Sequence, residues 1–222
     1  TGSEILDVGE VQTNDAQIRS SNHLTLEAIA KQYGANALQM GIVEDDKESI
    51  TSLLKEALLK SDIVVTTGGV SVGDYDYVKD VIKDELECEV LFQGVLIKPG
   101  QHILFAKKGE KFIIGLPGFA YSSTVTFILY ILPLLFKFKG SFESLNIVDA
   151  IIDENFPKKG NKTNFTACNV NFNNGSYHVD FEGKKHGTSA ILTNMLGSPA
   201  LLIQEEGSQD LKQGDKVKVI LL

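Results

Sequence analysis

Along the first two thirds of the chain, stretches with helical periodicity alternate with short unbroken apolar runs. Apolar residues recur every three or four positions over residues 22–33 and again over 46–60, which predicts two amphipathic helices. Strands are predicted at residues 37–43, 62–66, 90–92, 102–106 and 111–114. Because strands that alternate with helices form βαβ units, we predict an α/β domain over residues 1–146, with a mostly parallel sheet flanked by helices.

The longest apolar run covers residues 127–136 and lies in a predicted helix over 119–138. A transmembrane helix needs about 20 apolar residues, and Pro133 interrupts this run. We therefore predict a buried core helix and no association with a membrane.

Beyond residue 147 the apolar period changes to two, which is typical of strands with one buried face. Apolar residues alternate with polar ones over residues 168–172 and again over 177–181. The dipeptide Asn174-Gly175 between these runs is the strongest short-range signal of a β-hairpin. Two further strands are predicted at residues 200–203 and 216–220. We therefore predict a small all-β C-terminal domain over residues 147–222.

Charge and cysteine content exclude several classes of protein. The 222 residues include 29 acidic and 21 basic side chains, a formal charge of −8, without a lysine or arginine block that contains aromatics. Nucleic acid is therefore not an expected partner. Cys88 and Cys168 have no cysteine or histidine beside them at metal-ligand spacing, so neither a disulfide framework nor a zinc site is indicated. We predict a cytoplasmic protein, and the start at Thr1 predicts an internal or processed fragment.

Residues 66–79 are the most informative segment, because a buried strand runs into a glycine-rich loop and then into a helix. The loop is Gly68-Gly69-Val70-Ser71-Val72-Gly73. Free backbone N–H groups at the carboxyl end of a strand, beside a helix N-terminus, bind phosphates and other oxyanions. The loop matches neither the nucleoside triphosphate fingerprint nor the dinucleotide fingerprint. We predict an anion-binding loop.

The same loop matches G-x-S-x-G, the nucleophile elbow of α/β-hydrolases, so a serine hydrolase using Ser71 is an alternative. An elbow turns directly into its helix, whereas residues 74–76 intervene here. Two of the later histidines, His178 and His186, lie in the predicted β domain, and His102 has no obvious acid partner. Ser71 is therefore a better candidate for a hydrogen-bond donor than for a nucleophile.

Other predicted strand ends also carry polar or Gly/Pro chemistry. They are Thr1-Gly2-Ser3-Glu4, Glu44-Asp45-Asp46, Ile97-Lys98-Pro99-Gly100 and Gly115-Leu116-Pro117-Gly118. Because the carboxyl ends of parallel strands lie along one edge, we expect these segments to converge on one crevice. Glu4, Asp45 and Asp76 would then gather carboxylates beside the cation of Lys98. Carboxylates fit a site for an anionic ligand when Mg²⁺ bridges them to phosphate oxygens, although Asp45 and Asp46 also suit a helix start.

These segments, taken together, resemble a known family. The order and spacing of the four strand-end motifs and the glycine loop resemble MoeA, the molybdopterin molybdenumtransferase that is also found as the E domain of gephyrin. The β domain, with His186-Gly187-Thr188-Ser189 and Leu196-Gly197, resembles that family's C-terminal domain more loosely. The resemblance implies insertion of molybdate into adenylylated molybdopterin (molybdopterin-AMP) with release of AMP, in a Mg²⁺-dependent step.

The resemblance also implies residue roles. Catalytic positions are Asp76, Asp45, Glu4 and Lys98, and the Mg²⁺ ligands are Glu4, Asp45, Asp46 and Asp76. Positions that would bind the pterin substrate are Gly68, Gly69, Ser71, Gly73, Pro99, Gly100, Pro117, Gly118 and Thr188. The family's N-terminal domains would precede this chain and build a homodimer, so we expect the fragment alone to be inactive.

Four positions depart from the family pattern. Where the family has Gly-Leu-Pro-Gly-Asn-Pro, this chain has Gly115-Leu116-Pro117-Gly118-Phe119-Ala120. Gly94 stands at a position where the family commonly has a basic residue, and Ala167 aligns with an arginine of the family. Each lost charge-assisted contact would weaken anion binding by about 1.5–3 kcal/mol. The alternative is therefore a divergent paralogue that acts as a binding or scaffolding module, whose role would survive Asp76→Asn.

Overall fold

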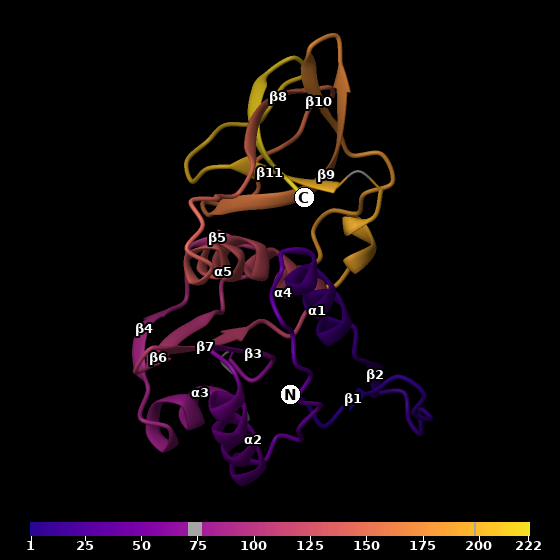
Figure 1. The fold of residues 1–222 in the computed structure, drawn as a ribbon. Helices are drawn as coiled ribbons and strands as arrows, with labels where there is room; N and C mark the ends of the chain where they lie inside the picture. Colours follow the sequence, from indigo (N-terminus) through magenta and orange to yellow (C-terminus); the bar gives the residue numbers. More distant parts are fainter. Residues whose placement is uncertain (71–76, 198) are drawn as a thin grey trace. The chain divides into compact units, whose positions relative to one another are not determined.

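The computed structural model describes residues 1–70, 77–197 and 199–222. The chain forms two compact units. The first contains Thr1–Val95 and Gly100–Phe127, and the second contains Leu96–Pro99 and Ile128–Leu222 (Figure 1). The domain boundary at residue 146 stays a prediction, and the two units are described separately.

The first unit contains a four-stranded mixed sheet. Its strands, in spatial order, are β3 (Ile63–Thr67), β7 (Lys111–Leu116), β6 (Leu104–Lys108) and β4 (Glu89–Gln93). The β3–β7 pairing is parallel, whereas β7–β6 and β6–β4 are antiparallel. The α/β class is confirmed, but the expected mostly parallel sheet is corrected to a mixed one. The physical reason is the tight turn at residues 109–110, because so short a connection joins only antiparallel strands.

The first unit differs from the expectation in a second place. Residues 37–43 were expected to form a strand, but they carry no strand pairing. Gly41 adopts a positive φ of 91°, which interrupts extended backbone in the middle of the segment. A separate, short two-stranded parallel sheet in this unit consists of β1 (Ile5–Leu6) and β2 (Ile18–Arg19).

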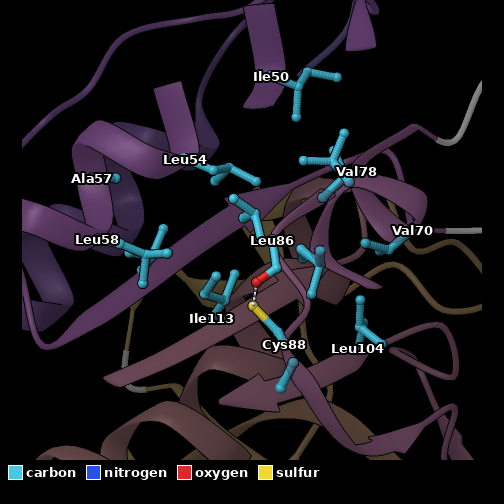
Figure 2. Packing of buried hydrophobic residues seen from close by; sticks show 14 residues of the cluster. Ile50, Leu54, Ala57, Leu58, Val70, Val78, Leu86, Cys88, Leu104 and Ile113 are labelled. Atoms are coloured by element: carbon cyan, nitrogen blue, oxygen red, sulfur yellow. Dashed lines mark hydrogen bonds between the residues drawn. The ribbon is translucent and has the colours of Figure 1, made fainter. Parts of the chain in front are cut away.

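Helices cover both faces of the four-stranded sheet (Figure 1). One face carries α2 (Lys47–Lys60), α3 (Tyr77–Asp80) and the π-helical turn η1 (Val81–Glu85). The other carries α4 (Ala120–Thr126), and α1 (Asn22–Gln32) lies beside α4. Figure 2 shows the core between the first face and its helices. Its members include Ile50, Leu54, Leu58, Val64, Val70, Val78, Ile82, Leu86, Cys88, Leu104 and Ile113. The amphipathic stripe predicted for the helix at residues 46–60 is therefore the stripe that packs on the sheet.

The predicted helix at residues 119–138 is present, although it is not uniform. It consists of α4 (Ala120–Thr126), the π-helical turn η2 (Phe127–Ile131) and α5 (Leu132–Phe138). Pro133 has no N–H for the regular ladder, and a widened turn directly before it accommodates the lost bond. By length and apolar content alone this helix could cross a membrane, but 61% of its most apolar window is buried, and core helices meet the same criterion.

The second unit contains a closed β barrel. Its strands are β8 (Ile147–Ile152), β9 (Thr163–Asn173), β10 (Ser176–Asp180), β11 (Pro199–Gln204) and β12 (Lys216–Leu221). Because β10 pairs with both β8 and β9, the order β10–β8–β12–β11–β9 closes on itself. The all-β C-terminal domain is confirmed. The predicted hairpin is also confirmed, since Asn174 and Gly175 connect β9 to β10 with φ of 49° and 81°.

One strand of this sheet comes from far upstream in the sequence. The two-residue strand β5 (Ile97–Lys98) pairs in parallel with Thr163 and Asn164 of β9.

Inside the barrel, burial raises the pKa of the Cys168 thiol to about 12. Both Cys168 and Cys88 are free and buried.

Lysines from the β6–β7 hairpin bind the C-terminal carbonyls of two helices. Lys111 Nζ donates to Leu58 O in the last turn of α2, and Lys108 Nζ donates to Leu86 O at the end of η1, each at 2.5 Å.

We expect Lys111→Met to lower the free energy of unfolding by about 1 kcal/mol, because a half-buried carbonyl loses its charged donor. Urea unfolding of Lys60→Met is the control, since the pair that Lys60 forms with Glu56 is exposed. Equal losses in both variants would contradict this account.

Candidate functional site

The glycine loop begins where β3 ends, at Thr67. Gly68 and Gly69 both have positive φ, of 86° and 68°. A Cβ on Gly69 would lie 2.5 Å from Cγ2 of Val78, so only glycine allows the loop to pack this tightly on α3. The N–H of Gly68 donates to Leu116 O at 3.0 Å, which ties the loop to the end of β7.

The segment Thr1–Glu4 lies directly against this loop. The backbone nitrogen of Thr1 donates to Thr67 O at 2.9 Å. A Cβ on Gly68 would lie 2.8 Å from the Thr1 carbonyl oxygen. The hydroxyls of Thr1 and Thr66 are buried without a hydrogen-bond partner among the described residues. Unsatisfied hydroxyls beside a glycine turn are groups that a polar ligand or water would satisfy.

Two carboxylates flank the same segment. Asp45 and Ser3 exchange hydrogen bonds: Ser3 N donates to Asp45 Oδ2, and Asp45 N donates to Ser3 Oγ, both at 3.4 Å. The Glu4 side chain folds back, so that its Oε2 lies 2.8 Å from the position of a Cβ on Gly2. Gly2 N also donates to Val43 O at 3.3 Å. The segment Thr1–Glu4 therefore contacts both Asp45 and the glycine loop.

The Pro117–Gly118 turn completes this edge of the sheet. It follows β7, which is parallel to β3, so the carboxyl ends of the two strands meet there. A Cβ on Gly118 would lie 3.5 Å from Gly68 Cα, and Asn22 Nδ2 donates to Gly118 O at 2.7 Å. The edge is thus lined by backbone from two glycine turns.

Asp46 has a structural task that competes with the predicted role as a metal ligand. Its side chain accepts a hydrogen bond from Ser49 N at 2.8 Å and caps α2. This hydrogen bonding holds the pKa of the Asp46 carboxyl below its usual value. Among the described residues, no three acidic, histidine or cysteine side chains are placed to hold a metal ion. Glu4 and Asp45 offer carboxylate oxygens, and the fourth predicted ligand, Asp76, lies outside the described residues.

The remaining predicted residues lie elsewhere. Lys98 is exposed on β5 and Pro99 is buried, and both belong to the second unit, whereas Gly100, with φ of 101°, belongs to the first. Thr188 is exposed in the second unit, and its Oγ1 accepts from Ala190 N at 3.2 Å. Ser71 and Gly73 lie outside the described residues.

The histidines considered for a hydrolase triad in the second unit are engaged with their own neighbours. His178 Nδ1 lies 2.8 Å from Asp153 Oδ1. His186 packs edge-on against Phe156 and Phe181, and burial lowers its pKa. The sequence does not mark Asn22 or the Thr66 hydroxyl as a part of the site. Asn22 gave only the signal of a helix start, and Thr66 gave none beyond its place at a strand end.

Two known families match this chain. Residues 1–137 match the family described as "Probable molybdopterin binding domain", so the α/β unit with its glycine turns belongs to the class of molybdopterin-binding domains. Residues 149–222 match "MoeA C-terminal region (domain IV)", which covers the barrel. With both matches in order along one sequence, this chain belongs to the MoeA family.

Each of these relatives aligns with nearly the whole of this chain, and the chain spans about half of each relative's length. It is 33% identical over 225 residues to a protein of Staphylococcus aureus (strain MRSA252) named "Molybdopterin molybdenumtransferase", spanning 100% of this chain and 52% of the relative. A Staphylococcus epidermidis protein of the same name is 31% identical over 222 residues, with the same shares covered. The solved structure of a "molybdopterin biosynthesis moea protein from Pyrococcus horikosii" has a TM-score of 0.79 at 25% identity, covering 99% of this chain and 52% of that one.

Proposed function

We propose that the full-length protein acts in molybdenum cofactor biosynthesis, inserting molybdate into molybdopterin-AMP and releasing AMP. The observation that carries this proposal is the meeting of the Gly68–Gly69 turn, the Pro117–Gly118 turn and two carboxylates at one edge of a molybdopterin-binding domain. The relatives' shared name supports the same chemistry. The protein would work in the cytoplasm as a homodimer. Its N-terminal domains would correspond to the part of the relatives that this chain does not span.

Each group at this edge has a task in the proposed reaction. Backbone N–H groups of the two glycine turns would orient the pterin and its phosphate. Glu4 and Asp45 offer carboxylate oxygens, and one or two carboxylates together with substrate phosphates are a usual Mg²⁺ environment. Mg²⁺ bound there would neutralise charge on the pyrophosphate. From the family resemblance alone, we propose that Lys98 attracts the molybdate anion and that Asp76 supplies a further carboxylate.

The proposal is tested in a strain that lacks its own molybdenumtransferase. The full-length gene should restore molybdoenzyme activity, and the same gene with Asp76→Asn should not. Glu56→Gln is the control for a lost carboxylate, because Glu56 lies on the exposed face of α2 and pairs with Lys60. Failure of the unmodified gene would refute the proposed activity. Full complementation by Asp76→Asn would show that the proposed reaction does not need the Asp76 carboxylate.

A further inference from the structure

The Asn22 side chain makes a contact that its position in the sequence does not suggest. Asn22 is the first residue of α1, and its Nδ2 donates to the carbonyl of Gly118, 96 residues further along the chain, at 2.7 Å. Both residues belong to the first unit. Gly118 in turn lies against Gly68, because a Cβ on Gly118 would be 3.5 Å from Gly68 Cα. The Asn22 amide is therefore one step removed from the glycine loop.

The geometry separates this contact from ordinary helix capping. An asparagine at a helix start commonly bonds to N–H groups of its own first turn through its side-chain oxygen. In α1 the N-cap residue is Ser21, and it makes no side-chain cap hydrogen bond. Asn22 uses its nitrogen as a donor, and it points that donor at a carbonyl of the Pro117–Gly118 turn. Stabilisation of α1 itself does not need this donor.

We propose that Asn22 is a positioning residue that fixes the Pro117–Gly118 turn so that its backbone is ready to receive the pterin substrate. The inference rests on the proposed function for the identity of the ligand, whereas the ordering of the turn does not depend on it. Without the amide, the turn loses its tether to α1 and must be ordered when the ligand binds. Preorganisation of a binding loop lowers that cost of ordering.

The chain offers a matched control on the same helix. Gln39 Nε2 donates to His23 O at 3.0 Å and to Glu27 Oε2 at 2.8 Å, so it also tethers α1 with an amide, but without touching the Pro117–Gly118 turn. Asn22→Ala and Gln39→Ala each remove one amide tether of α1. Asn22→Asp keeps the size of the side chain, and it replaces the donor with a negatively charged acceptor.

Two measurements on the full-length protein test the inference. First, hydrogen exchange of ligand-free protein is followed in the peptide covering residues 115–121. Exchange should become faster in Asn22→Ala and Asn22→Asp and stay unchanged in Gln39→Ala. Second, the Kd for molybdopterin-AMP should rise by about three- to tenfold in both Asn22 variants, as expected for loss of one hydrogen bond, and not in Gln39→Ala.

The outcomes separate the two proposals. Unchanged exchange at residues 115–121 in the Asn22 variants overturns the positioning role, whatever the ligand. Faster exchange with an unchanged Kd for molybdopterin-AMP overturns the link between the turn and binding. If the unmodified protein does not bind molybdopterin-AMP, the proposed function fails, and hydrogen exchange still decides whether Asn22 orders the turn.

Discussion

Gly115→Ala is expected to lower the free energy of unfolding by about 1–3 kcal/mol, which is a large share of the stability of a domain. Gly115 lies in β7, and a Cβ at this position would be 2.3 Å from Cγ1 of Val70. Val70 is buried in the core between the sheet and its helices and directly follows Gly68 and Gly69. The methyl group can be accommodated only if Val70 moves, and that movement would disturb the glycine loop as well. Urea unfolding gives the loss directly.

The clash itself is tested by removing the other partner. Val70→Ala deletes the methyl group that the new Cβ would meet, at the cost of a small cavity. In this background Gly115→Ala should cost much less than it does alone, because the two substitutions share one contact. Gly118→Ala is the comparison for a glycine with room, since its nearest neighbour would be at 3.5 Å. Equal costs of Gly115→Ala in both backgrounds would show that the clash with Val70 is not the cause.

Asp45→Asn is expected to reduce kcat/KM of the full-length protein by about 10²-fold, the usual effect of removing one preorganised charged group. Asparagine keeps an oxygen that can accept the hydrogen bond from Ser3 N, so the Thr1–Glu4 segment should stay in place. What is lost is the negative charge, which we assign to holding Mg²⁺. Steady-state AMP release measures the loss, and the apparent Mg²⁺ affinity should fall with it.

The control for Asp45 is its neighbour in the chain. Glu44 is exposed, whereas Asp45 is half-buried against Ser3. Glu44→Gln makes the same change of charge one residue away and should change kcat/KM by less than about twofold, because exposed charges are screened by solvent. If the two variants lose the same activity, a general loss of negative charge, rather than a specific carboxylate, explains the effect.

Features fixed by neighbouring residues could be predicted from the sequence. The helix that begins after Asp46, the Asn174-Gly175 hairpin and the glycine turn after β3 all follow from local chemistry, since caps and positive φ angles have short-range signals. The antiparallel β6–β7 hairpin could also have been found. The short connection at Gly109 indicates an antiparallel pair, and the expectation of a mostly parallel sheet did not take it into account.

Features that depend on distant pairing could not be predicted. Ile97 and Lys98 join the barrel through Thr163 and Asn164, and two residues carry too little pattern to indicate such a partner. Asn22 has the sequence signal of a helix start, while its observed partner is Gly118. Within the site, the approach of the Thr1–Glu4 segment to the glycine loop is what the sequence predicts, because strand ends in an α/β sheet share an edge. The roles of Glu4 and Asp45 stay predictions.

The most direct test of the central claim is AMP release by the purified full-length protein from bound molybdopterin-AMP. With molybdate and Mg²⁺ present, the account predicts about one AMP per molybdopterin-AMP consumed and a molybdenum-loaded pterin that activates an apo-molybdoenzyme. Omitting either ion should suppress both products. A protein that binds molybdopterin-AMP but releases no AMP when both ions are present would contradict the claim that this site catalyses molybdate insertion.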